Sequence, residues 1–320
     1  MPKPVSRRQA LQLGFLASIA GLGVAGCTPG PRLDSLTVAG GESGGFYLEF
    51  ATLLAASLER HGVAGKSSAL VTGGSLDNLD RLARGEATLA IALADAAAER
   101  VNGQSQPASP ATPGLAALAR VYENYVHCLV RKDSPIAAVA DLTGRAVGVG
   151  AHGAGTILIA RRLLSTAGVS VREEELGLND GLAALQNRSI EALFWSGGVP
   201  TAAVAAVAKN VGLRLLDLSA LIVPTRAQYG QFYDRVLVPE GAYEGIPSTW
   251  TVGATNLLLC RADLGPDVVR GTVDLLLTRA NELVPASSLG VQFLSPETLI
   301  NTAGIPLHSA AQEAYRAFHG

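Results

Sequence analysis

The chain has 320 residues, of which 48% are hydrophobic and 16% are charged, and its formal net charge is −2. This length and hydrophobic content suffice for a packed core and suggest two domains. A mildly acidic chain without a basic patch argues against binding to nucleic acid.

The N-terminal 26 residues have the pattern of an export signal. Arg7 and Arg8, within SRRQAL, resemble a twin-arginine signal, and residues 11–24 form an apolar stretch too short for a typical membrane span. The sequence VAGC that ends at Cys27 resembles a bacterial lipobox, in which this cysteine becomes the lipid-modified first residue after cleavage. We therefore expect an exported protein, lipid-anchored to the outer face of the cell membrane or in the periplasm, with a tether over residues 27–34. A plain signal peptide, or an anchor helix with an incidental cysteine, is the alternative.

A strand, a glycine-rich turn and a helix are predicted from Leu36 to Leu58. The strand is short and apolar, four glycines between residues 40 and 45 favour a tight turn, and the helix begins at Phe46. A helix that begins at such a turn directs unpaired N–H groups and a partial positive charge beyond the end of the strand. This arrangement favours an anion there, most simply a carboxylate.

The same combination recurs at residues 72–75, 150–156 and 196–200, each time after a predicted strand. Alternation of strands and helices predicts an α/β protein with mostly parallel sheets. Ligands of such sheets bind beyond the carboxyl ends of the strands, where these four turns lie. Two lobes whose turns face each other would form a ligand-binding cleft.

The segments between these units are less regular. Residues 103–114 are rich in Pro, Ser and Gly and are predicted to form a surface loop, after which two strands are expected at 115–121 and 126–130. Residues 221–248 contain three prolines and are expected to be irregular. A long apolar strand is expected at 250–259 and a helix at 267–282.

Two cysteines remain besides Cys27. Cys128 and Cys260 lie in apolar, strand-like runs, and an exported protein permits a disulfide between them. Two buried free thiols are the alternative that we favour. No spacing of Cys and His indicates a metal site, and we expect no cofactor.

Six runs follow one another along the chain: AGGESGGFY, TGGSLDNLDRLARGEATLAIALAD, DLTGRAVGVGAHGAGT, ALFWSGGVPTAAV, VPEGAY with TVGAT, and IPLHSAAQEAY. Together they resemble the TAXI family, the extracytoplasmic solute-binding subunits of TRAP-type secondary transporters. The resemblance covers nearly all of the chain from Leu36 onward.

The resemblance implies a two-lobe periplasmic-binding-protein type II (Venus-flytrap) fold, α/β with mostly parallel sheets. Lobe 1 would comprise residues 35–124 and 251–320, and lobe 2 would comprise residues 125–250. The lobes would close on a small organic acid or amino acid, without catalysis, about hinges near 122–130 and 238–255. The protein would then deliver this solute to the integral membrane subunits of a TRAP transporter.

Candidate ligand-binding residues follow by position in the motifs. Phe46 and Tyr47 match the first motif, although Leu48-Glu49 replaces its usual proline. The third motif lacks the serine and acidic residue that the family carries, and His152 would compensate in part. The complete set is Glu42, Ser43, Gly44, Phe46, Tyr47, Thr72, Gly74, Ser75, Asn78, Asp95, Tyr122, His152, Ala154, Gly155, Thr156, Ser196, Gly197, Gly198 and Pro200.

Some of these residues have a structural interpretation of equal weight. Asp95 would cap a helix or contact a ligand ammonium, and Tyr122 would form the cleft floor or pack in the core. His127 and Trp195 are expected in the core, and the pair Arg161-Arg162 on a solvated helix face.

Three other functions are open alternatives. An ABC importer uses the same fold with a different membrane partner, and a sensory module differs only in its receptor. The run GESGG fits the nucleophile elbow of a serine hydrolase, with Ser43, His308 and Asp263 or Asp267 as the triad. Such an elbow would lie on the first strand of the mature chain, which leaves no preceding loop for an oxyanion hole.

Overall fold

The computed structural model describes residues 33–103, 114–285 and 294–320. The predicted export signal, the lipobox at Cys27, and nearly all of the tether and of the predicted loop at 103–114 lie outside these residues. Contacts unite residues 32–320 into one compact unit, so the predicted boundaries of two lobes stay a prediction. Within the described part of the chain, no helix has the length and hydropathy needed to cross a membrane.

Ten strands form one continuous sheet. Eight of them follow the order β2-β1-β3-β10-β4-β7-β5-β6, while β8 pairs with β4 and β9 pairs with β10. The strands are β1 (Leu33–Ala39), β2 (Ala64–Leu70), β3 (Leu89–Leu93), β4 (Leu115–Arg131), β5 (Ala146–Gly148), β6 (Arg172–Glu174), β7 (Ala192–Gly197), β8 (Leu213–Leu215), β9 (Tyr233–Val238) and β10 (Thr249–Arg261). Pairing is parallel between β1, β2 and β3 and between β5, β6 and β7, as predicted.

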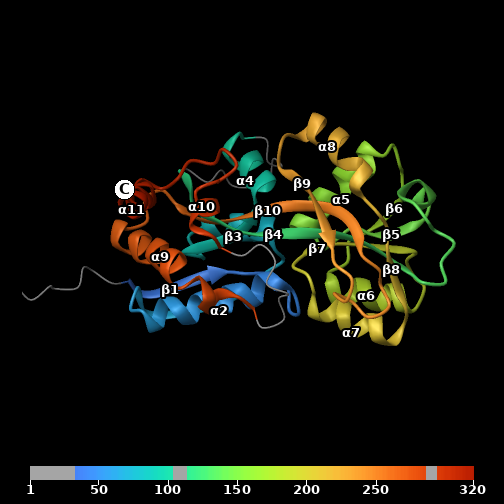
Figure 1. Ribbon diagram of the computed structural model, residues 1–320, viewed down its shortest axis with the longest axis horizontal. Helices are drawn as coiled ribbons and strands as arrows, with labels where there is room; N and C mark the ends of the chain where they lie inside the picture. The colour runs from blue at the N-terminus through green and yellow to red at the C-terminus, as the bar shows by residue number, and fades with distance from the viewer. Residues whose placement is uncertain (1–32, 104–113, 286–293) are drawn as a thin grey trace, which may run out of the picture. The chain divides into compact units, whose positions relative to one another are not determined.

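Two long strands, β4 and β10, join the two parallel groups (Figure 1). They pair antiparallel with each other, β10 also pairs antiparallel with β3, and β4 also pairs antiparallel with β7. The expected separate sheets are therefore one sheet, and the two strands expected at 115–121 and 126–130 are one strand, β4. Both strands are buried along almost their whole length, so neither shows the alternation of apolar and polar residues that a strand with one exposed face would have.

Helices cover the sheet and pack on one another. Helix α2 packs on β1 and β2, helix α5 packs on β7, and α9 packs against α11. The helices are α2 (Phe46–Arg60), α3 (Ser75–Ala83), α4 (Ala94–Val101), α5 (Gly155–Thr166), α6 (Leu178–Gln186), α7 (Ala202–Asn210), α8 (Ile222–Tyr229), α9 (Pro266–Thr278), α10 (Pro296–Leu299) and α11 (Ser309–His319), with 3₁₀ turns at Val139–Leu142, Ser219–Leu221 and Ala280–Leu283.

The expectation of irregular structure over residues 221–248 is wrong. This segment contains α8 and β9, and β9 pairs with β10. The three prolines do not prevent these elements. Pro224 lies in the first turn of α8, where an N–H group would have no partner within the helix, and the other two lie just beyond β9 and just before β10.

Both remaining cysteines are buried free thiols, as favoured from the sequence. Cys260 on β10 pairs with Ala116 on β4, twelve residues before Cys128 on the same strand. At the rise of a β-strand this separation is roughly 40 Å, far beyond the reach of a disulfide.

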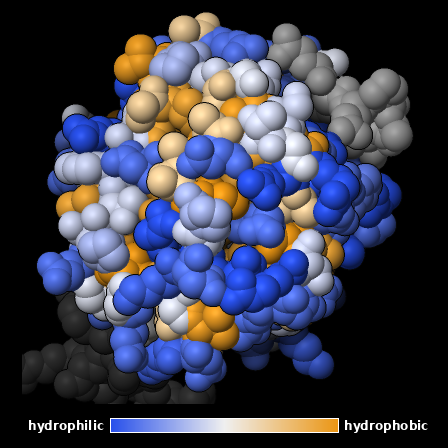
Figure 2. Space-filling model, turned by 90° about the vertical axis from the view of Figure 1, so that its right-hand side faces the viewer, coloured by the Kyte–Doolittle hydropathy of each residue, from blue (hydrophilic) through white to orange (hydrophobic). Residues whose placement is uncertain are grey.

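The surface at the end of the sheet that carries β5 and β6 is mixed in character. On the face shown in Figure 2, hydrophobic residues lie in separate small patches among hydrophilic ones. Large contiguous apolar patches mark stable protein interfaces, and the described residues on this face form none.

Candidate functional site

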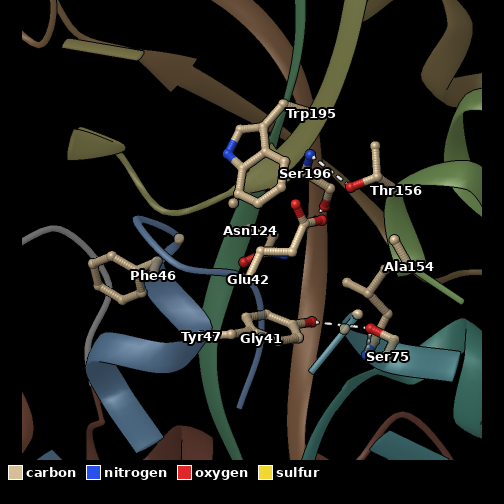
Figure 3. A pocket seen from close by; sticks show the side chains of 16 residues that line it. Gly41, Glu42, Phe46, Tyr47, Ser75, Asn124, Ala154, Thr156, Trp195 and Ser196 are labelled. Atoms are coloured by element: carbon tan, nitrogen blue, oxygen red, sulfur yellow. Dashed lines mark hydrogen bonds between the residues drawn. The ribbon is translucent and has the colours of Figure 1, made fainter. Parts of the chain in front are cut away.

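The four glycine-rich turns predicted from the sequence meet around one cavity (Figure 3). Its volume, measured for the centre of a water-sized sphere, is about 30 Å³, which is room for about two water molecules. The lining residues are Gly41, Glu42, Gly45, Phe46, Tyr47, Gly73, Gly74, Ser75, Leu93, Asn124, Ala154, Gly155, Thr156, Trp195, Ser196 and Gly197.

Three helices begin at this cavity. Phe46, Ser75 and Gly155 are the first residues of α2, α3 and α5, and all three line it. The fourth predicted helix start, at α7, does not reach the cavity with its first residue, Ala202. The N–H groups in the first turn of a helix lack acceptors within that helix. In α3, those of Leu76 and Asp77 donate to Gly153 instead, so the potential donors to a solute lie mainly at the starts of α2 and α5.

A chain of polar side chains forms one wall of the cavity. The hydroxyl of Tyr47 contacts Ser75 Oγ at 3.2 Å and donates to Asn256 Oδ1. Asn256 Nδ2 donates to Asn124 Oδ1 at 2.9 Å, and Asn124 Nδ2 donates to Ser196 Oγ at 3.1 Å. These bonds connect α2, α3, β10, β4 and β7 along one side of the cavity.

The second and third turns are in direct contact. The carbonyl oxygen of Gly153 accepts hydrogen bonds from the N–H groups of Leu76 and Asp77, both at 3.0 Å, in the first turn of α3. A Cβ atom at Gly155 would lie 2.5 Å from Leu93 Cδ1 and 2.6 Å from Ser75 Oγ, so any larger residue here must displace both buried side chains.

Glu42 crosses from the first turn to another helix. Its Oε2 atom accepts a hydrogen bond from the N–H group of Leu178, the first residue of α6, at 2.6 Å. The neighbouring backbone oxygen of Ser43 accepts a hydrogen bond from Asn179 at 3.0 Å. Burial raises the pKa of the Glu42 carboxyl, the Leu178 N–H group lowers it, and the charge of Asp180 raises it, with a net rise. The first turn is therefore fastened to α6 by two hydrogen bonds.

Several predicted ligand-binding residues support the cavity without lining it. Asn78 is buried and donates to the carbonyl oxygens of Ala39, Gly40 and Ile91, and Thr72 accepts from the N–H group of Gly74. The others that do not line it are Ser43, Gly44, Asp95, Tyr122, His152, Gly198 and Pro200.

Tyr122 packs in the core, which is one of the two positions predicted for it; it does not form the cleft floor. It is buried against the rings of Phe46, Tyr47 and Phe50, whose centroids lie 5.0, 6.1 and 5.2 Å from its own. Tyr122 is therefore core, packed against Phe46 and Tyr47, two of the three aromatic residues that line the cavity.

His152 is exposed and lies 3.3 Å from Glu175, away from the cavity. It therefore does not compensate for the polar groups that the third motif lacks. Pro200 follows a cis peptide bond and is half-buried beside the fourth turn.

Asp95 is bound by other side chains. Its Oδ1 atom accepts from the N–H group of Ala96, and its Oδ2 atom accepts from Arg162 Nη1 at 2.6 Å and from the Tyr233 hydroxyl at 2.7 Å. The placement of Arg162 on a solvated face is thus wrong, because the residue is buried, whereas Arg161 is exposed and pairs with Glu173 and Glu175. Adjacent helical positions point about 100° apart, which separates the two arginines.

Other lining residues were not proposed from the sequence. Three glycines lie in the predicted turns but were not among the predicted ligand-binding residues: Gly41, Gly45 and Gly73. Trp195 was expected in the core, and it lines the cavity while its Nε1 donates to Thr201 Oγ1 at 3.0 Å. Leu93 and Asn124 lie in strands, and no local signal distinguishes the side of the sheet that they face.

His127 and His308 have structural roles. His127 is fully buried, its Nδ1 atom lies 2.9 Å from the Tyr125 carbonyl oxygen and its Nε2 atom 2.9 Å from the Tyr243 hydroxyl. His308 accepts from the N–H group of Ala310 at the start of α11. The carboxylates proposed to accompany it in a triad are instead paired with arginines, Asp263 with Arg261 and Asp267 with Arg270.

The sequence matches the model of the NMT1-like family over residues 38–317. The chain belongs to the NMT1-like family. This match does not distinguish the TAXI family, which the motifs suggest, from other NMT1-like proteins.

Solved structures with low sequence identity resemble this NMT1-like chain. A protein of Bordetella bronchiseptica RB50 is 15% identical, with 90% of this chain and 98% of that chain covered and a TM-score of 0.55. XAC2383 from Xanthomonas citri, bound to a chloride ion, is 12% identical, with 89% and 99% covered and a TM-score of 0.51. The periplasmic aliphatic sulphonate binding protein SsuA from Escherichia coli is 16% identical, with 88% and 78% covered and a TM-score of 0.44. The predicted α/β class, with mostly parallel pairing within each strand group, is confirmed by the topology, and the fold is shared with the first two of these solved structures.

Proposed function

We propose that this protein is the extracytoplasmic solute-binding subunit of a membrane transporter and binds a small carboxylate or an amino acid in the cavity. The observation that carries this proposal is the convergence of Phe46, Ser75 and Gly155, the first residues of three helices, on one cavity. Helix N-termini stabilise anionic groups through free N–H donors and the helix dipole. No bond of the solute needs to be broken for this function.

The polar wall of the cavity supplies specificity for the solute. The hydroxyl groups of Ser75, Thr156 and Ser196 and the amide of Asn124 all line the cavity or its edge. Aromatic and glycine surfaces make up most of the remainder, which is typical of a small-molecule site with a few oriented polar groups.

Binding would require the two sides of the cavity to separate and close again. The present cavity holds only about two waters, so an organic solute needs more room than it offers. In this proposal lobe 1 is residues 35–124 and 251–320, lobe 2 is residues 125–250, and the hinges lie in β4 and β10. The hydrogen bonds of Glu42 and Ser43 to α6 would form on closure.

For the membrane partner we propose the integral subunits of a TRAP-type transporter, as the TAXI-like motifs suggest, with Cys27 as the lipidated anchor residue. An ABC importer is the second candidate, because it uses binding proteins of the same fold. Solute uptake into cells distinguishes the two: uptake that an ionophore abolishes at normal ATP supports TRAP, and uptake that follows ATP supports ABC.

A serine hydrolase is not favoured. Ser43 is exposed at the first turn, His308 caps α11, and the carboxylates of the expected triad pair with arginines. A catalytic serine requires a histidine base within hydrogen-bond reach.

A thermal-shift screen of the mature chain against organic acids and amino acids tests the proposal. A solute at about 100 times its Kd adds about 2.7 kcal/mol to the free energy of unfolding, which raises the Tm by about 5 °C or more. The hit should bind more weakly to Ser75→Leu, which fills the cavity, and equally well to the exposed control Ser165→Leu. A broad library without any hit would count against the solute-binding function.

A further inference from the structure

The cavity contains a single charged side chain. Among the described residues that line it, Glu42 alone carries a formal charge, and no arginine, lysine or histidine is present. Glu42 is half-buried and extends into the space between Trp195 and Tyr47 (Figure 3). An anionic solute would therefore meet a like charge in a partly dry site, with no cationic side chain to offset it.

Only part of the Glu42 carboxylate is used within the protein. Oε2 accepts the hydrogen bond from Leu178, while the described residues provide no hydrogen bond to Oε1. A carboxylate has about four lone-pair positions, so Glu42 has acceptor capacity left for a solute. Because burial already disfavours its charged form, a cationic hydrogen-bond donor is the partner that stabilises it most.

The side chains around Glu42 also suit a cation. The rings of Phe46, Tyr47 and Trp195 line the same cavity. Aromatic faces attract ammonium and guanidinium groups, and the attraction strengthens when water is excluded.

The helix starts on the other side of the cavity differ from Glu42 in chemistry. At α3, the Ser75 hydroxyl is bonded to Tyr47 and to the N–H group of Leu93. At α5, Gly155 and Thr156 are the first two residues, and their N–H groups lack acceptors within the helix. These N–H groups favour a carboxylate, so the cavity has donor groups at the start of α5 and an acceptor at Glu42.

We infer that the solute carries a protonated amine or an amidinium group that donates hydrogen bonds to Glu42, and that Glu42 disfavours acids without such a group. This inference rests on the proposed function, because it concerns the same cavity. Among the solutes that the proposed function allows, it selects amino acids over simple mono- and dicarboxylates.

Isothermal titration calorimetry with matched pairs tests the inference on the full mature chain. Suitable pairs are L-alanine with propionate, L-leucine with 4-methylpentanoate, and L-glutamate with glutarate, where each pair differs by the amino group. We expect the best amino acid to bind at least tenfold more tightly than its partner acid. Glu42→Gln, which keeps the shape and removes the charge, should reduce the affinity for that amino acid at least tenfold and raise the affinity for the acid, because the like charge is gone.

Two further variants separate charge recognition from folding. Asp180→Asn removes a negative charge near Glu42 but outside the lining, and it should change either affinity less than threefold. Glu42→Asp keeps the charge on a shorter side chain and should retain part of the preference for the amino group, even if Glu42→Gln folds poorly.

The outcomes distinguish this inference from the proposed function. Equal affinity for the two members of each pair, or an unchanged preference in Glu42→Gln, would overturn the inference while solute binding itself stands. Failure of every member of the panel to bind the wild-type chain, together with an empty thermal-shift screen, would overturn both.

Discussion

Asp95 on α4 and Arg162 on α5 form a buried ion pair, with Oδ2 of the first 2.6 Å from Nη1 of the second. Tyr233 on β9 donates to the same carboxylate oxygen, and Arg162 also pairs with Glu99. Helix α4 follows β3 and α5 follows β5, so the pair connects helices that adjoin the two parallel strand groups. It lies apart from the lining of the cavity and offers a second link between these groups.

Replacing Arg162 with methionine should destabilise the protein strongly. The substitution leaves the buried Asp95 carboxylate without its cation, which typically costs about 3–5 kcal/mol. The matched control is Arg161→Met, because Arg161 pairs with two carboxylates at the surface and its loss should cost about 1 kcal/mol or less. Urea unfolding of both variants measures the difference, and similar values for the two would contradict the buried pair.

Gly155→Ala should weaken solute binding. The added methyl group would lie 2.5 Å from Leu93 Cδ1 and 2.6 Å from Ser75 Oγ, so these two buried lining side chains must shift and the cavity must change shape. We expect at least a tenfold loss of affinity for the best solute in calorimetry. The control is Gly265→Ala, where a Cβ atom meets nothing within 4 Å, and affinity there should remain at the wild-type value.

Asn124→Ala should disrupt the polar wall of the cavity. The change removes the acceptor of Asn256 Nδ2 and the donor to Ser196 Oγ, and leaving buried polar groups unpaired typically costs about 1–3 kcal/mol. Asn210→Ala, which removes an exposed side chain at the end of α7, should cost much less. Chemical unfolding compares the two, and equal stabilities would mean that the wall contributes nothing.

The pH dependence of stability should reflect two buried groups that act in opposite directions. Burial lowers the pKa of His127 to about 4, so between pH 4 and about 6.5 the unfolded chain binds a proton that the folded chain does not, and stability rises with pH. Burial raises the pKa of Glu123 to about 7, so between about 4.5 and 7 the folded chain holds a proton that the unfolded chain loses, and stability falls with pH.

Substitution of His127 therefore reveals the contribution of Glu123. The two slopes offset each other in the wild type over pH 4.5–6.5, whereas His127→Gln retains only the falling one. Urea unfolding at intervals from pH 4.5 to 7.5 should give a flatter curve for the wild type than for the variant. Parallel curves would show that His127 titrates alike in the folded and unfolded chains.

The sequence by itself was sufficient to locate the glycine-rich turns and the helices that follow them. Gly44, Gly74 and Gly150 adopt positive φ values of 82°, 112° and 102°, and each stands shortly before the start of a helix. These are local properties, since tolerance of positive φ and free N–H groups at helix starts depend on neighbouring residues alone. The α/β class followed from the same local pattern.

The tertiary structure decided which side chains enter the cavity and which strands join the sheet. Asn124 lies in β4, whose two faces are both buried, so an alternating pattern that would assign its direction is absent from the sequence. The pairing of Arg162 with Asp95, and of Glu42 with the start of α6, joins residues 67 and 136 positions apart. Such contacts depend on the register and packing of distant elements, which no local sequence preference encodes.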